Sequence, residues 1–414
     1  MRKCFTLLSF ALCCMLAMSA NPVMKTIQSG GYEREYLLYI PEKYNENSPA
    51  GLLVCLHGFN RTMNDFFNDY NIGELAETLN LIVLAPQALP EKNPDVLFTL
   101  QTISSIGIKI PISLDAVWGC GLQVVAKVPV VGTLLDVTLN TVVDDVAFIK
   151  EIIFETENNF NIIPENKFIF GTSMGGYMSY QYALYNGNDL SGLINICGSM
   201  GTSIQHANAE VELPICDFHS VDDEVVPYTG KMEMDASLFK VSVTLSQNKE
   251  NVINTWVSKN GANTNPTVEN INYYPSTSGY SVEKYTYTGE NEVIHYKMTG
   301  SSHNHFFKRE TDCMDYFEEV AKFITANSKG SHAGNEAFAQ KKQQLTISPN
   351  PVVGYQVNLN IEEGLVAIYN LNGQKVLSGT FENGTVNIGT LQSGVYIIRV
   401  ITENETYQGK LIVR

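Results

Sequence analysis

The sequence is short of basic side chains. Its 27 Lys and Arg residues stand against 43 Asp and Glu, which gives a formal net charge of −16 at pH 7. Nucleic-acid binding depends mainly on Lys and Arg side chains that neutralise phosphates. The balance therefore disfavours a nucleic-acid partner and is more typical of a secreted protein that stays in solution.

Long hydrophobic runs are also missing. An apolar stretch over residues 5–16 follows a basic start and precedes the small residues Ser19 and Ala20. It is shorter than the ~20 residues that a membrane-spanning helix needs. This arrangement predicts a secretory signal peptide over residues 1–20, and no transmembrane segment in the mature protein.

Cysteine is scarce after this segment, because only five of the eight residues remain. An odd number leaves at least one thiol unpaired or paired with another chain. No two have the spacing of zinc ligands, and we expect neither a metal nor another cofactor. Three of the five lie in apolar, strand-like runs, which favours small buried side chains over a disulfide framework: Cys55, Cys197 and Cys216.

What the sequence does contain is an alternation of two patterns. Short apolar runs typical of buried strands alternate with segments of helical spacing. This alternation predicts an α/β fold with a mostly parallel sheet covered on both faces, and a site at the carboxyl ends of its strands. The strand-like runs are residues 35–40, 51–56, 81–85, 167–170, 193–197 and 214–218, and the helical segments include 143–155 and 174–185.

Composition divides the chain further. Residues 21–326 form the predicted catalytic domain, and residues 327–344, rich in Ser, Gly, Lys and Gln, a linker. Residues 345–414 contain short alternating segments separated by Asn-Gly and Ser-Gly turns, which predicts a small β-sandwich. The apolar residues 97–140 fit core, a lid or an acyl pocket equally well.

Residues 171–175 (GTSMG) carry the clearest chemical signal. A Gly-x-Ser-x-Gly segment between a strand and a helix is typical of a nucleophile elbow. Gly171 and Gly175 keep Cβ atoms away from the tight turn, and Ser173 lies at a helix N-terminus, which favours developing negative charge. Ser173 is therefore the predicted nucleophile.

A serine nucleophile needs a base and a carboxylate that orients the base, in the chain order Ser, acid, His. Residues 219–224 offer the acid after one strand, and residues 300–305 offer the base before a helix. On this pattern alone four acids remain candidates for the orienting carboxylate: Asp217, Asp222, Asp223 and Glu224. His303 and His305 are the candidates for the base, with His295 a distant third. His206, His295 and His332 have no partner motif, and we expect them to be solvated.

One oxyanion donor in this arrangement is the backbone N–H of the residue after the nucleophile, Met174. The early loop after residues 51–56 supplies the other, which we assign to Phe59. His57, beside Gly58, precedes the serine in the chain. We expect it to brace this loop rather than act as the base.

Residues 29–323 resemble the secreted feruloyl esterases and polyhydroxybutyrate depolymerase-like α/β-hydrolases. The matching segments are residues 34–41 (REYLLYIP), His57-Gly58, 143–149 (VDDVAFI), the elbow, 219–228 (HSVDDEVVPY) and 300–303. The resemblance implies an α/β-hydrolase fold with Asp223 as the acid and His303 as the base. Ser220 stands where the family has Gly, and residues 304–306 (NHF) differ from its usual Thr-Trp-Pro.

Residues 345–414 resemble the C-terminal sorting domain of type IX secretion substrates, through residues 348–351 (SPNP), 369–374 (YNLNGQ) and 391–396 (LQSGVY). The resemblance implies that the type IX machinery is a partner, and that the protein is released or held at the cell surface.

These patterns together predict a secreted serine esterase that acts through an acyl-enzyme. The resemblance implies feruloyl or acetyl esters of plant polysaccharide as substrates. A polyester depolymerase, a serine peptidase of the same fold and a non-catalytic surface binding protein are the alternatives.

Overall fold

The computed structural model describes most of the chain. The described residues are 21–105, 114–129, 132–203, 211–236, 239–329, 345–370, 375–402 and 406–414. The expected signal peptide, most of the expected linker, the Asn372-Gly373 turn, His206 and His332 lie outside them. No helix of the described residues is long and apolar enough to cross a membrane.

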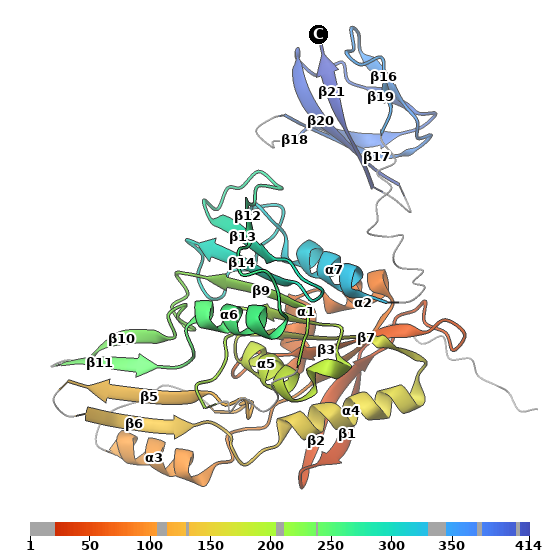
Figure 1. The fold of residues 1–414 in the computed structure, drawn as a ribbon. Coiled ribbons are helices and arrows are strands. Elements are labelled where there is room, and N and C mark those ends of the chain that lie inside the picture. The colour runs from red at the N-terminus through yellow and green to blue at the C-terminus, as the bar shows by residue number, and fades with distance from the viewer. Residues whose placement is uncertain are drawn as a thin grey trace, which may run out of the picture.

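A ten-stranded sheet forms the centre of the larger part (Figure 1). Its order is β1-β2-β4-β3-β7-β8-β9-β14-β13-β12, parallel from β4 to β14 and antiparallel at both ends. The expected mostly parallel sheet is confirmed. The strands are Val23–Ser29, Tyr32–Tyr39, Leu81–Pro86, Ala50–Leu56, Ile162–Thr172, Gly192–Ile196, Ile215–Ser220, Val293–Thr299, Ser281–Tyr287 and Thr267–Asn270, in the order of the sheet.

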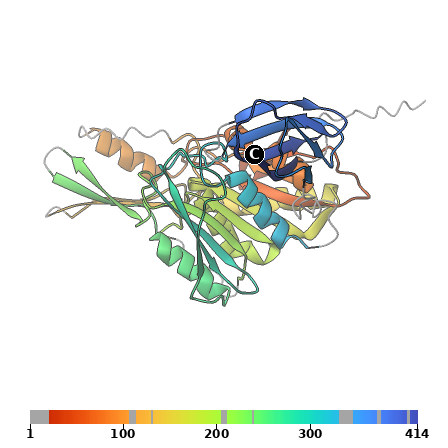
Figure 2. The same cartoon turned by 90° about the horizontal axis from the view of Figure 1, so that it is seen from above.

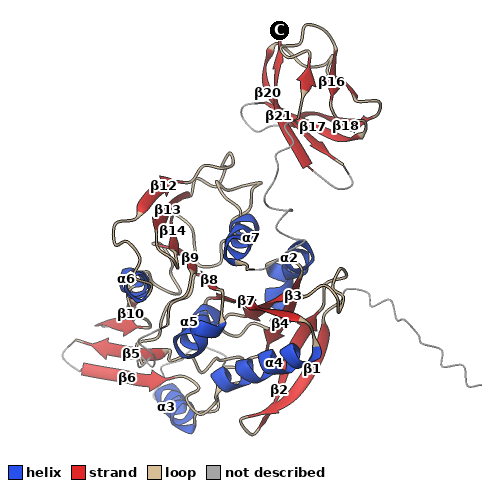
Figure 3. Ribbon diagram, turned by 45° about the vertical axis from the view of Figure 1, so that its right-hand side comes forward, coloured by secondary structure: helices blue, strands red, loops and turns tan. Residues whose placement is uncertain are grey.

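Helices cover both faces of this sheet (Figure 3). On one face, α4 (Asp145–Asn159), α5 (Met174–Asn186) and α6 (Lys249–Lys259) contribute to one apolar cluster. On the other face, α1 (Met63–Asp69), α2 (Ile72–Leu79) and α7 (Tyr316–Asn327) contribute to a second. Both faces of the central strands are therefore buried, which explains why those strands are continuous apolar runs.

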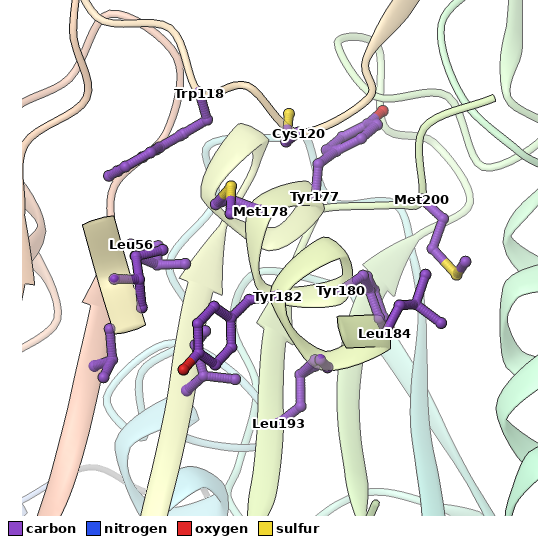
Figure 4. Packing of buried hydrophobic residues seen from close by; sticks show 14 of the residues in the cluster. Leu56, Trp118, Cys120, Tyr177, Met178, Tyr180, Tyr182, Leu184, Leu193 and Met200 are labelled. Carbon is purple, nitrogen blue, oxygen red and sulfur yellow. The ribbon is translucent and has the colours of Figure 1, made fainter. Parts of the chain in front are cut away.

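Strand β3 illustrates how this works. Leu52 and Val54 belong to the first cluster, whereas Leu53 and Cys55 belong to the second, because successive side chains of a strand point to opposite faces. Helix α5 lies against the first face, and Trp118 lies near its N-terminal end (Figure 4). This packing holds the start of α5 above the carboxyl ends of the strands.

Residues 97–140, for which core, lid and pocket were all open, divide into parts. Part of the stretch completes helix α3 (Pro94–Ser105), and Trp118 and Cys120 are fully buried core. Residues 106–113 and 130–131 lie outside the described residues. Further along, β5 (Gln123–Val128) and β6 (Gly132–Thr138) belong to a second, antiparallel sheet. Two further strands complete it in the order β10-β11-β5-β6, namely β10 (Lys231–Ala236) and β11 (Phe239–Thr244). Figures 1 and 2 show this sheet extending beyond the central one.

The C-terminal part is composed of two small sheets around its own apolar cluster. One has the order β15-β16-β19 and the other β18-β17-β20-β21. At the Asn383-Gly384 turn both residues have positive φ, 55° and 67°, as an Asn-Gly hairpin turn requires. The strands are Ile347–Ser348, Gln356–Leu359, Gly364–Asn370, Lys375–Phe381, Thr385–Asn387, Gly394–Ile401 and Thr406–Val413, from β15 to β21.

Candidate active site

Ser173 lies in the sharp turn between β7 and α5, with φ 51° and ψ −123°. A residue other than glycine rarely adopts this backbone conformation, and the packing of the two neighbouring glycines enforces it. A Cβ on Gly171 would lie 2.2 Å from the Gly175 carbonyl oxygen, and one on Gly175 would lie 2.0 Å from that of Leu56. Only glycine fits at both positions, so the turn holds its shape and lifts the serine above the sheet edge.

Three of the predicted residues meet at this edge although they are far apart in the sequence. His303 Nε2 lies 3.0 Å from Ser173 Oγ, and His303 Nδ1 lies 2.7 Å from Asp223 Oδ2. The Asp223 side chain is fully buried, and that of His303 is 8% exposed. In this geometry Nδ1–H donates to the carboxylate, which leaves the Nε2 lone pair facing the serine hydroxyl.

The Asp223 carboxylate is fixed on its other side by the backbone. Its Oδ1 accepts hydrogen bonds from Val225 N at 2.9 Å and Val226 N at 2.7 Å. Burial by itself would raise the pKa of Asp223, but the hydrogen bond from His303 and the electrostatic attraction to its ring outweigh it, and the pKa falls below the usual value. The acid is therefore held ionised and oriented.

The other candidate acids have separate partners. Asp222 Oδ2 accepts from Gly300 N at 2.7 Å, and Glu224 Oε2 accepts from His303 N at 3.2 Å. These two carboxylates tie the loop that carries His303 to the loop that carries Asp223. Among the acids of this segment, Asp223 is the one whose side chain meets the imidazole of His303, and Asp217 lies elsewhere.

The early loop lies directly beside the serine. A Cβ on Gly58 would be 3.2 Å from the Ser173 Cβ, which is a tight contact, so glycine at residue 58 eases the close approach of the loop. In the part of the chain that the structure describes, no hydrogen bond occupies the backbone N–H of Met174 or of Phe59. Both N–H groups therefore lack a competing partner within the described residues, and their assignment to an oxyanion hole stays a prediction.

His57 braces this loop from beneath. It is fully buried, its Nδ1 donates to the Gly58 carbonyl at 2.8 Å, and its Nε2 accepts from Ala88 N at 3.0 Å. The Trp118 indole donates to the His57 carbonyl at 2.8 Å. Burial lowers the pKa of His57 to about 4, so the ring is neutral, and both ring nitrogens are occupied by backbone groups.

His305 and His295 lie away from the serine. His305 Nε2 lies 2.9 Å from Asp312 Oδ1, and the ring packs against Tyr280 and Phe307, so it is a packing residue. The expectation that His295 is solvated was wrong. It is only 2% exposed, because β14 lies inside the sheet between β9 and β13.

His295 belongs to a buried polar network that the sequence analysis missed. Asp217 lies at its centre, with Oδ2 2.8 Å from His295 Nδ1 and Oδ1 2.8 Å from Lys249 Nζ. Tyr180 and Asn195 also donate to Oδ1, and Tyr228 OH lies 2.9 Å from His295 Nε2. Asp217 within a strand of buried residues was the available signal, because a buried carboxylate requires partners.

Burial by itself would raise the pKa of Asp217, but the Lys249 ammonium and His295 hold it far below the usual range. The carboxylate and the ammonium therefore form a buried ion pair. Lys249 Nζ also donates to the Gly198 carbonyl at 2.6 Å. The position of Gly198 is crowded, since a Cβ there would lie 2.6 Å from the Ser173 carbonyl oxygen. The network thus supports the loop beneath the elbow.

The five cysteines after the expected signal peptide are all described, buried and free of disulfide bonds, in agreement with the preference for buried thiols. Cys197 was not singled out for its position, yet it lies close to the proposed acid and base. Among the described residues, Cys197, Asp223 and His303 are the group of side chains whose potential metal ligands gather within 4.8 Å of one another.

Comparison with known families agrees with the two resemblances. Residues 346–414 match the family described as "Secretion system C-terminal sorting domain". This match indicates type IX secretion to the cell surface or beyond. Residues 140–255, which span the elbow and the proposed acid, match the family described as "Phospholipase/Carboxylesterase".

Curated relatives include two fungal proteins named "Probable feruloyl esterase C". The Aspergillus flavus protein is 24% identical over 198 residues, which cover 48% of this chain and 58% of the relative. The Aspergillus niger protein is 23% identical over 201 residues, 49% of this chain and 59% of the relative. The chain thus spans less than two thirds of the length of either relative.

Among solved structures, an acetyl xylan esterase from Aspergillus awamori aligns with 74% of this chain and all of its own, at 13% identity and a TM-score of 0.47. A ferulic acid esterase from Anaeromyces mucronatus aligns with 69% of this chain and 85% of its own, at 13% identity and a TM-score of 0.37. The sheet order and the elbow described above define the fold as an α/β-hydrolase fold followed by a small β domain.

Proposed function

We propose that the protein is a secreted serine esterase with Ser173, His303 and Asp223 as its catalytic residues. The continuous path of hydrogen bonds from Asp223 Oδ2 through His303 to Ser173 Oγ carries this proposal. The match of residues 140–255 to a carboxylesterase family and the similarity to feruloyl esterases support the class of bond.

The reaction follows from the positions of the atoms. Ser173 Oγ attacks the ester carbonyl carbon while its proton passes to His303 Nε2. The N–H groups of Met174 and Phe59 stabilise the negative charge on the carbonyl oxygen. Collapse expels the alcohol, which takes the proton from His303. His303 then removes a proton from water as the resulting hydroxide attacks the acyl carbon. Collapse breaks the bond to Ser173 Oγ, which takes the proton back from His303, and the acid is released.

The proposed substrates are feruloyl or acetyl esters of plant polysaccharide. The names of the similar proteins, feruloyl esterase and acetyl xylan esterase, support this choice. Export through the tail would bring the enzyme to a polymer outside the cell.

A fluorophosphonate probe tests the mechanism, because it phosphonylates an activated serine. We expect one adduct, located on Ser173 by mass spectrometry and absent from the Ser173→Ala variant. An unlabelled Ser173 in folded protein would overturn the mechanism. Turnover of methyl ferulate, acetylated xylan, a hydroxybutyrate oligomer and a peptide amide tests the proposed substrate class. Faster hydrolysis of the oligomer or of the amide would overturn the proposal of feruloyl or acetyl esters.

A further inference from the structure

Cys197 lies next to the proposed catalytic pair but has no part in the proposed reaction. It follows strand β8 in a conformation with φ 53° and is only 2% exposed. Its sulfur, a carboxylate oxygen of Asp223 and a ring nitrogen of His303 lie within 4.8 Å of one another. The three residues come from separate strand ends, so the fold itself gathers them.

Thiolate, imidazole and carboxylate are the ligands that zinc prefers in proteins. We propose that Cys197, Asp223 and His303 form an inhibitory binding site for a thiophilic divalent cation such as Zn²⁺. A tetrahedral zinc site with bonds of about 2.0–2.3 Å separates its ligand atoms by roughly 3.3–3.8 Å. To reach this spacing, the 2.7 Å distance between His303 Nδ1 and Asp223 Oδ2 must lengthen by less than about 1 Å. The Cys197 sulfur must move toward these two atoms by no more than about 1.5 Å.

Inhibition follows from the proton positions in His303. In the metal-free protein Nδ1 carries the proton and Nε2 accepts from Ser173. A cation bound at Nδ1 needs the lone pair of that nitrogen, so the ring proton moves to Nε2 through solvent exchange. The protonated Nε2 cannot accept the serine proton. The Cys197 thiol loses its proton to solvent when the sulfur binds, so each cation releases one proton in total.

The same contacts explain why the site is selective. Mg²⁺ and Ca²⁺ prefer to be surrounded by oxygen ligands, and Asp223 is the one member of this group of three with a carboxylate. Without a cation, the buried Cys197 side chain lies beside the His303–Asp223 pair, and the hydrogen bonds from Asp223 through His303 to Ser173 are intact. Among the described residues, no other cysteine lies in such a group of ligands.

Titration of the full chain with Zn²⁺ and with Cd²⁺ tests the proposal, with p-nitrophenyl acetate as the substrate. We expect full inhibition that a chelator reverses, and at least a tenfold higher inhibitory concentration in Cys197→Ala. Cys216→Ala is the matched control, since Cys216 is a buried cysteine of the neighbouring strand β9, and its inhibition should equal that of the wild type. Equal inhibition of all three proteins would overturn the site.

A second measurement is independent of the proposed esterase activity. Cd²⁺ bound to a thiolate gives an ultraviolet charge-transfer band, which should appear at one Cd²⁺ per chain in the wild type and in Cys216→Ala. Its loss in Cys197→Ala supports the site even if no ester is hydrolysed. A band that persists in Cys197→Ala, or a Cd²⁺ complex that still labels Ser173 at the full rate, would contradict the proposal.

Discussion

The molecule contains two histidine–aspartate pairs with the same geometry and different surroundings. His303 Nδ1 lies 2.7 Å from Asp223, and His295 Nδ1 lies 2.8 Å from Asp217. The far nitrogen of each ring meets a hydroxyl, that of Ser173 at 3.0 Å and that of Tyr228 at 2.9 Å. A search for Asp–His–hydroxyl geometry alone would find both.

Their surroundings decide what each pair can do. Asp217 is shared with the Lys249 ammonium, so its charge is already neutralised. The Asp223 carboxylate instead contacts His303, His219 and the backbone N–H groups of Val225 and Val226. Ser173 stands at a strained turn beside free N–H groups, whereas burial strongly raises the pKa of Tyr228. We infer that one pair serves catalysis and that the other stabilises the fold beneath it.

The largest expected effect separates the two pairs by activity. Asp223→Asn should lower kcat by about 10⁴-fold, because the amide cannot hold the productive tautomer of His303. The free energy of unfolding should change much less than in the matching Asp217→Asn variant. Esterase kinetics and urea unfolding of both proteins check this. A loss of only a few-fold in kcat would remove Asp223 from the proposed mechanism.

The next effect concerns stability at the second pair. Asp217→Asn leaves the Lys249 ammonium buried without its counter-ion, and breaking a buried ion pair typically costs about 3–5 kcal/mol. Urea unfolding should show this loss, while kcat per folded molecule stays within a few-fold of the wild type.

The double variant Asp217→Asn/Lys249→Met is the control, because it removes both charges. It should recover part of the lost stability. A single variant as stable as the wild type would mean that the ion pair contributes nothing to folding.

His57 extends the comparison of the two pairs, because both of its ring nitrogens contact backbone groups rather than a carboxylate. Burial lowers the pKa of His57 to about 4, and burial and Lys249 do the same for His219. An unfolded histidine titrates near 6.5, so the unfolded chain binds more protons between pH 6.5 and 4. The stability from these neutral rings is complete above pH 6.5 and falls as the pH falls, by about 1.4 kcal/mol per pH unit for each ring.

His57→Gln should therefore remove about half of this slope and leave the part due to His219. Unfolding midpoints measured in urea from pH 7 to pH 4.5 check the prediction. An unchanged slope would mean that His57 is protonated in the folded protein.

The sequence was sufficient where chemistry and spacing are local. The elbow follows from two glycines around Ser173, and the parallel sheet from continuous apolar runs. Asp223 could be chosen over the other candidate acids only by resemblance to a known family. All four candidates lie near the end of one strand, and the geometry of the loop decides which carboxylate contacts His303. His295 was misjudged because its partner Asp217 lies 78 residues away in the sequence, and Lys249, which pairs with Asp217, lies 46 residues away. No local pattern indicates contacts over such separations.

The second sheet escaped prediction for the same reason. Its middle pair joins β11 to β5, two strands more than 100 residues apart in the sequence. Pairing over such a separation depends on the central sheet that brings their bases together. The apolar composition of residues 97–140 therefore suggested core, a lid or an acyl pocket, but it did not indicate the strands with which part of this segment pairs.

The smallest expected effect concerns Tyr228, whose hydroxyl lies against His295 of the second pair. Tyr228→Phe removes a hydroxyl that donates to Glu250 Oε1 at 3.0 Å and meets His295 Nε2. The lost hydrogen bonds and the unsatisfied ring nitrogen should lower the free energy of unfolding by about 1–2 kcal/mol, with kcat unchanged. Ser173→Ala, the matched change at the other pair, should do the opposite and abolish turnover without loss of stability. If Tyr228→Phe instead lowered kcat at full stability, the second pair would have to be coupled to the reaction, and the division of roles between the two pairs would be wrong.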